Sequence, residues 1–146
     1  MAFRGTYDHS LDAKNRLTVP SKFRPQLTET VVLTKGIQPC VAIYTPDEFE
    51  QYVDAFRSGM HPGSTQARQV DQFFQANAFD IEIDSAGRVM VPPKLAEYAG
   101  IDKDVHVVGV RNHIEVWDRE AWAEHNETLV GAMGDISDLL GGQTAS

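Results

Sequence analysis

Apolar residues recur along the chain with two different periods, and the changes between them predict its elements. Short runs of valine, leucine and isoleucine are typical of strands, and they occupy residues 31–33, 41–44, 105–110 and 114–117. Apolar spacings of three and four residues, with proline or acidic residues at the start, are typical of helices. They predict helices over residues 21–27, 46–56, 65–78, 93–98 and from 118 through Trp122. The pattern favours a mainly β protein of α+β content, with peripheral helices.

A motif of polar and apolar positions is written twice. The segment from Leu11 to Lys22 returns from Ile83 to Lys94, at an offset of 72 residues, and five of the twelve aligned pairs are identical. Unrelated segments of average composition would share about one. Repetition at one fixed offset indicates a duplicated supersecondary unit. The chain is therefore predicted to carry two copies of one surface, related by an approximate twofold axis.

Each copy of the motif predicts a tight turn between two short strands. Asn15 and Gly87 occupy the same position of the repeat, and these residue types accept positive φ most readily. Asp12 and Asp84 stand where their carboxylates can accept hydrogen bonds from N–H groups of the turn. The duplication thus keeps one backbone requirement while changing the residue that meets it.

The segments between and after the repeats are predicted to differ from them. The helix over residues 65–78 has no counterpart in the other half, so we interpret it as a bridge between the copies. Apolar residues are scattered beyond Val130, and the final residues, 141–146, are small and polar, so this end of the tail is expected to be disordered. The expected organisation is a first repeat over 5–48, a helical bridge over 49–78, a second repeat over 79–122, and a C-terminal helix with a flexible tail over 123–146.

Charge is distributed unevenly along the 146 residues. The net charge is −8, yet residues 1–40 carry six basic and three acidic groups, so the first unit is locally basic. Such a face can attract phosphates even on an acidic protein, because screening confines the field to about 8 Å. The lone Cys40 allows no internal disulfide, and no apolar run is long enough to span a membrane. A cytoplasmic protein without a membrane partner is expected.

Signatures of catalysis are missing from the sequence. The five histidines do not pair with each other, with Cys40 or with acidic residues at metal-ligand spacing, and there is neither a phosphate-binding loop nor a nucleophile elbow. The two repeated aspartates each precede an arginine by four residues, which favours an ion pair or a turn cap over an acid–base pair. We expect no enzyme, no metal and no cofactor.

Residues 3–7 and 9–24 closely resemble the opening of the MraZ proteins, and residues 84–92 resemble the second motif of that family. MraZ proteins belong with the AbrB-like (SpoVT-AbrB) group, so the resemblance implies a pseudo-twofold, swapped-hairpin (double-split) β-barrel built from two repeats. It also implies a nucleoid-associated transcriptional regulator of the division and cell-wall gene cluster, including its own promoter. Such a regulator would bind spaced repeats of double-stranded DNA as a ring-like homo-oligomer.

Basic residues around the two turns are the predicted DNA contacts. Arg16 and Arg88 are expected to reach phosphates or base edges, because a guanidinium donates two parallel hydrogen bonds. An internal ion pair with Asp12 and Asp84 is the alternative for these arginines, and both roles are compatible. The residues expected to contact mainly phosphates are Lys14, Lys22, Arg24, Arg4 and Lys94. In the second unit Ala86 replaces Lys14 and Ala96 replaces Arg24, so the first unit is expected to dominate.

Two other functions stay open at this stage. The AbrB-like group, by resemblance, includes antitoxins whose tails wrap a toxin, so the chain could be a protein-binding module. A metal-dependent enzyme is the third hypothesis. Binding to upstream DNA, capture of a toxin-like partner and metal analysis would separate the three.

Overall fold

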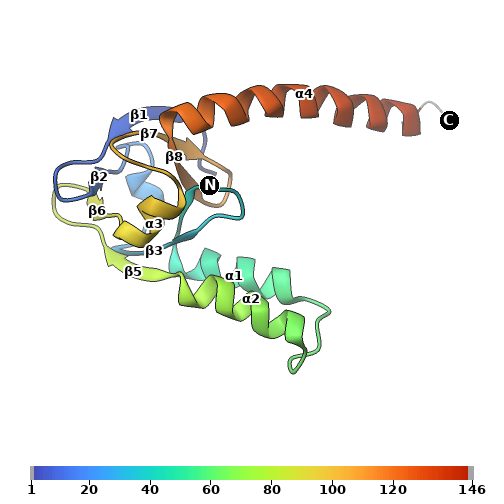
Figure 1. Cartoon of the computed structure of the whole chain (residues 1–146), viewed down its shortest axis with the longest axis horizontal. Helices are drawn as coiled ribbons and strands as arrows, with labels where there is room; N and C mark the ends of the chain where they lie inside the picture. Colours follow the sequence, from blue (N-terminus) through green and yellow to red (C-terminus); the bar gives the residue numbers. More distant parts are fainter. Residues whose placement is uncertain (1, 145–146) are drawn as a thin grey trace.

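Eight strands form two antiparallel sheets in the computed structural model, which describes residues 2–144 (Figure 1). The strands are β1 (Thr6–Ser10), β2 (Arg16–Thr18), β3 (Thr30–Lys35), β4 (Val41–Tyr44), β5 (Phe79–Glu82), β6 (Arg88–Met90), β7 (Asp104–Gly109) and β8 (Ile114–Asp118). Six of them form one sheet in the order β1-β7-β8-β4-β3-β5, while β2 and β6 pair with each other.

The two repeats exchange strands. β1 of the first repeat pairs with β7 of the second, and β5 of the second repeat pairs with β3 of the first. Within the β2–β6 ribbon Leu17 lies opposite Val89, its own counterpart at the offset of 72. An approximate twofold axis therefore passes through the centre of this ribbon, as the duplication predicts. The strand exchange means that neither repeat can bury its own core alone.

One main core lies between the ribbon and the six-stranded sheet. Leu17 and Val89, the central residues of the ribbon, are completely buried, and they belong to the same apolar cluster as Leu33 and Ile114 of the sheet. Because alternate side chains of a strand point to opposite faces, the neighbours of Leu17 and Val89 face solvent. The alternation thus fixes an inner and an outer face for the ribbon.

Helices α1 (Pro46–Arg57) and α2 (Thr65–Ala76) form an arm that projects from the sheets (Figure 1). Each begins where a hydroxyl caps it: Thr45 accepts from the N–H of Glu48 at 3.3 Å, and Ser64 accepts from the N–H of Ala67 at 3.1 Å. Aromatic rings hold the pair together, with Phe56 and Phe74 5.4 Å apart between ring centroids. On the apolar side of α1, Phe49 and Val53 are buried in the core, whereas Phe56 at the end of the helix stays exposed.

Two short helices follow the turns. The helix predicted over residues 93–98 is confirmed as α3 (Pro93–Tyr98), whereas the one predicted over 21–27 shrinks to the 3-10 turn η1 (Arg24–Gln26). Pro25 explains the difference, because it has no N–H to donate to the carbonyl of Ser21, as an α-helix over 21–27 would require.

Two parts of the predicted fold need correction. The hydrogen-bonded strands do not close into a barrel among the described residues, since β1 and β5 end the six-stranded sheet without meeting. The predicted C-terminal helix is longer than expected: α4 (Arg119–Thr144) includes residues 141–144 of the segment expected to be disordered, and residues 145–146 of that segment lie outside the described residues. Leu129, Met133 and Ile136 recur at helical spacing there, a pattern that the surrounding glycines conceal.

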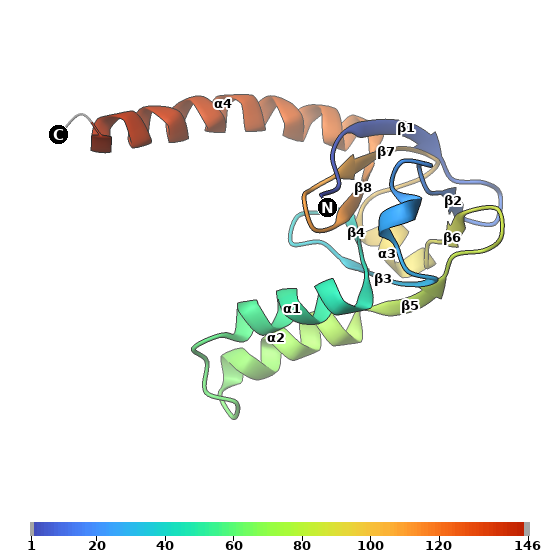
Figure 2. The same ribbon diagram turned by 180° about the vertical axis from the view of Figure 1, so that it is seen from behind.

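Helix α4 leaves the body as a second arm. Figure 2, from behind, shows that α4 and the α1–α2 pair extend from the sheets on the side away from the β2–β6 ribbon. Over residues 2–144 no helix combines the length and the apolar character needed to cross a membrane.

Candidate nucleic-acid interface

The two turns of the repeat have the predicted backbone. Asn15 adopts φ 58° and Gly87 φ 77°, both in the left-handed region. The N–H of Asn15 donates to the carbonyl of Asp12 at 3.0 Å, and the N–H of Gly87 donates to the carbonyl of Asp84 at 2.9 Å. The same turn is therefore built by two different residue types.

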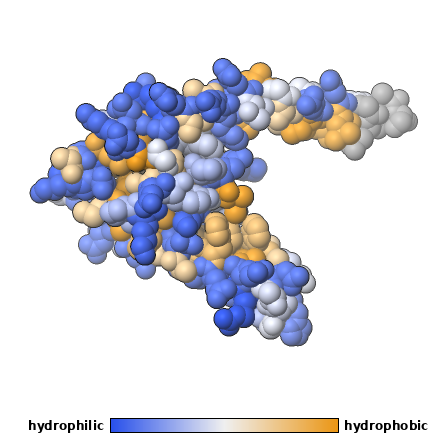
Figure 3. Space-filling view, viewed as in Figure 1, coloured by the Kyte–Doolittle hydropathy of each residue, from blue (hydrophilic) through white to orange (hydrophobic). Residues whose placement is uncertain are grey.

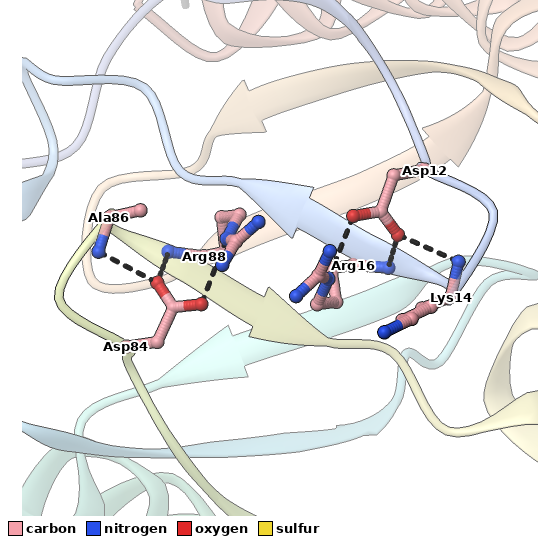
Figure 4. Close-up of polar contacts among 6 residues, drawn as sticks. All are labelled: Asp12, Lys14, Arg16, Asp84, Ala86 and Arg88. Atoms are coloured by element: carbon pink, nitrogen blue, oxygen red, sulfur yellow. Dashed lines mark hydrogen bonds and ion pairs between the residues drawn. The ribbon is translucent and has the colours of Figure 1, made fainter.

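One carboxylate organises each turn (Figure 4). Oδ1 of Asp12 accepts from the backbone N–H groups of Lys14 and Arg16, both at 2.9 Å, while Oδ2 accepts from Nε of Arg16 at 2.7 Å. Asp84 repeats this arrangement with Ala86 and Arg88 at 2.9, 2.9 and 2.8 Å. The aspartates thus fix the backbone and the arginine side chain together.

These contacts keep the aspartates ionised. The pKa of Asp12 lies below its ordinary value of 3.8, chiefly because the N–H of Arg16 donates to it; desolvation opposes this shift, and the guanidinium of Arg16 adds to it. The pKa of Asp84 is lowered for the same reasons by Arg88. Since the folded state favours the charged form, the stabilisation is present above pH 3.8 and is lost as the pH falls below that value.

Arg16 and Arg88 extend from the outer face of the ribbon. Their side chains are 29% and 33% exposed, and both point away from the buried Leu17 and Val89. The predicted ion pairs with the aspartates are present, and each uses only the Nε atom of the guanidinium. Within residues 2–144 the terminal nitrogens Nη1 and Nη2 have no hydrogen-bond partner, so each arginine is anchored at its base and open at its tip.

A contact between the repeats was not predicted. The guanidinium of Arg24, in the first repeat, lies against the turn of the second: a Cβ atom on Gly87 would stand 2.4 Å from Cζ of Arg24. Nε of Arg24 also donates to the carbonyl of Val19 at 3.0 Å. The sequence contains a signal for this contact. The turn that faces Arg24 has a glycine, Gly87, whereas in the equivalent pair of positions Asn15 occurs with the small Ala96.

The remaining basic residues do not all gather at the ribbon. Lys14 lies in the first turn, and Lys22 lines an adjacent hollow of about 330 Å³ together with Arg24 and His9. Burial lowers the pKa of His9; Asp8 opposes this shift and Arg24 adds to it. Lys94 lies in the first turn of α3.

Arg4 lies elsewhere. It precedes β1, whose other end leads to the first turn, and it lines a polar hollow of about 760 Å³ with Arg111 and Asn112. Strand β1 therefore separates Arg4 from the Asp12 turn.

Groups that could carry out other chemistry are not arranged for it. Cys40 is completely buried, and desolvation by burial raises the pKa of its thiol, with Glu115 adding to the shift. Such a thiol is a poor nucleophile. Among the described residues, no group of three or more His, Cys, Asp or Glu side chains could hold a metal ion.

Comparison with known proteins agrees with the duplicated motif. A family model described as "MraZ protein, putative antitoxin-like" matches residues 2–71 and 74–132. The chain is 41% identical over 139 residues to "Transcriptional regulator MraZ" of Lachnoclostridium phytofermentans, which covers 95% of this chain and 97% of that protein. The boundary between the two matched segments, at residues 72–73, lies inside α2.

Proposed function

Because the chain belongs to the MraZ family of transcriptional regulators, we propose that it binds double-stranded DNA through the outer face of the β2–β6 ribbon. Arg16 and Arg88 on that face are the main contacts, and Lys14 and Lys22 contact phosphates, which positions the protein on the DNA. The target implied by the family resemblance is the promoter of the division and cell-wall gene cluster, upstream of its own gene. The bound protein is then nucleoid-associated in the cytoplasm.

The observation that carries this proposal is the anchoring of both guanidiniums on one face. Each aspartate holds Nε and leaves the terminal nitrogens available, and two parallel N–H donors suit a phosphate or the O6 and N7 atoms of guanine. A two-stranded ribbon fits the width of the major groove. Since the side chains are already ordered by the turn, less entropy is lost when DNA binds.

The salt dependence of binding tests this proposal. We expect the protein to bind duplex from upstream of its gene more tightly than a scrambled duplex of equal length. The logarithm of the binding constant should fall linearly with the logarithm of salt concentration, by about 0.9 for each neutralised phosphate. Fluorescence anisotropy between low and physiological salt measures both. Equal affinity for the two duplexes, or a slope near zero, would contradict the proposal.

We also propose that the protein binds spaced DNA repeats as a homo-oligomer, and the apolar face of α4 supports this. Met133 is 56% exposed and Ile136 46%, and their spacing of three residues places them on one side of the helix. Exposed apolar surface of this kind is typical of interaction sites. In Figure 3 the hydrophobic residues of α4 gather on the side that looks toward the α1–α2 arm.

The duplication indicates what covers this face. Helix α4 follows β8 as α1 follows β4, and the apolar side of α1 is covered by α2, with Tyr52 packed against Phe74. No second helix covers α4 within the described chain. An apolar hollow of about 480 Å³ on the α1–α2 arm, lined by Phe56, Val70 and Phe73 among others, offers the matching surface. If α4 packs into the hollow of a second copy, the exposed apolar side of α4 and the apolar lining of the hollow are both buried.

Such an assembly gains affinity by effective concentration, because several ribbons meet several DNA repeats at once. The contact joins two different surfaces, so each copy can bind a further copy. The copies close into a ring only if the rotation between neighbours adds up to a full turn. The ring is implied by the family resemblance. A toxin-like partner on α4, the antitoxin alternative, is tested by the same variants.

Polar substitutions on α4 test the assembly. Met133→Gln with Ile136→Gln should lower the mass in solution toward that of a single chain, because two apolar anchors are replaced while the helix is kept. The matched control is Glu127→Gln with Asp138→Gln on the opposite side of α4, which should leave the mass unchanged. Sedimentation velocity measures both. If the first pair leaves a large assembly intact, this face is not the contact between copies; capture of a different protein by the wild type alone would favour the antitoxin alternative.

A further inference from the structure

The outer face of the ribbon breaks its own symmetry at one pair of positions. Four side chains project there, from Arg16 and Thr18 of β2 and from Arg88 and Met90 of β6. Arg16 and Arg88 are equivalent under the repeat, and so are Thr18 and Met90. The chain therefore presents a hydroxyl on one half of the face and a thioether on the other.

Met90 is a large apolar residue that stays exposed on the ribbon. Its exposed fraction is 50%, and it belongs to none of the buried clusters formed by the described residues. Outside α4, the other large apolar residues with comparable exposure are Ile37 and Phe56, and both line the hollow of the α1–α2 arm. Met90 is thus the exposed apolar group of the ribbon, and burying such a side chain is favourable.

The register places Met90 beside Arg16. The two residues lie directly opposite each other in the ribbon, and Thr18 lies opposite Arg88 in the same way. Ladder bonds join the N–H of Val19 to the carbonyl of Gly87 and the N–H of Val91 to the carbonyl of Asn15. The pairs of outward residues therefore occupy the non-hydrogen-bonded positions, where side chains approach each other most closely.

We infer that Met90 is a specificity-determining residue, which packs on the C5-methyl group of a thymine next to the site bound by Arg16. The thymine methyl is the apolar group that base edges present in the major groove. Thr18, its equivalent beside Arg88, is shorter and carries a hydroxyl, so the two halves of the face present different groups to DNA. The inference rests on the proposed binding of DNA by the ribbon, and it means that the recognised sequence is not a perfect palindrome even though the arginines are paired.

Removing single methyl groups from the DNA tests this inference. Each thymine of the upstream duplex that the protein binds is replaced in turn by deoxyuridine, which lacks only the methyl group. At one thymine in each bound site the replacement should weaken wild-type binding about fourfold, the effect expected when one methyl group is removed from an apolar interface. Replacement of the remaining thymines should change little.

Two variants show whether Met90 is responsible. Met90→Gln keeps the length of the side chain and removes its apolar end, so its affinity should no longer respond to that deoxyuridine. Met90→Leu keeps an apolar side chain and should retain the response. Because Met90 is exposed, both variants should melt within a few degrees of the wild type.

The outcomes separate the role of Met90 from the proposed function. Binding to the upstream DNA with a flat response to every deoxyuridine overturns the role of Met90 and leaves the proposed function standing. That role is likewise overturned if Met90→Gln keeps the wild-type response. Failure of the wild type to distinguish upstream from scrambled duplex overturns both the proposed function and this inference.

Discussion

Replacement of both ribbon arginines, Arg16→Ala with Arg88→Ala, should lower the affinity for upstream DNA by about 30-fold or more, because each bidentate contact is worth about 1–3 kcal/mol. The fold should survive, since both side chains lie on the outer face and their ion pairs are solvent-exposed. The salt slope should also flatten by about 0.9 for each phosphate that the variant no longer neutralises. Fluorescence anisotropy at several salt concentrations gives both quantities.

The single variants and one control make this result interpretable. Arg16→Ala should weaken binding more than Arg88→Ala, because Lys14 and Lys22 accompany the first turn while Ala86 takes the place of Lys14 in the second. Arg68→Ala removes the same charge from α2, on the arm that projects away from the ribbon (Figure 1), and should leave binding unchanged. A folded double variant that binds like the wild type would remove the ribbon from the interface.

Substitution of the turn glycine should have the largest effect on stability. Gly87→Val is expected to lower the free energy of unfolding by about 3 kcal/mol, of which about 1–2 kcal/mol is the cost of an L side chain in the left-handed region. The rest arises because the new Cβ would occupy the position of the Arg24 guanidinium, which must move and give up its hydrogen bond to Val19. Urea denaturation measures the change.

Asn15→Val is the matched control, because it places the same side chain in the same turn of the other repeat. There Ala96 takes the place of Arg24, so only the backbone cost should be seen, and Asn15→Val should be the milder change. In an Arg24→Ala background the destabilisation caused by Gly87→Val should shrink toward that of Asn15→Val. If Gly87→Val, Asn15→Val and Gly87→Val in the Arg24→Ala background all lower the free energy of unfolding equally, Arg24 does not constrain the second turn.

The elements that sequence reasoning predicted well are those whose causes are local. The helix over 93–98 and the strand over 41–44 are confirmed to the residue. Their apolar runs, prolines and flanking polar residues act within a few positions. The helix over 21–27 is shorter than predicted because of Pro25, whose effect is confined to its own turn. The disorder expected from residue 141 onward is wrong for residues 141–144, which continue α4 although they are small and polar.

The chain by itself determined the two turns, since every group that builds them lies within four residues: the aspartate, the residue of positive φ and the arginine. Only the tertiary structure decided what joins them. The exchange of β1 and β5, the common outer face of Arg16 and Arg88, and the contact of Arg24 with Gly87 bring together residues far apart in the chain. Such contacts depend on packing two repeats around one core, which no local spacing records.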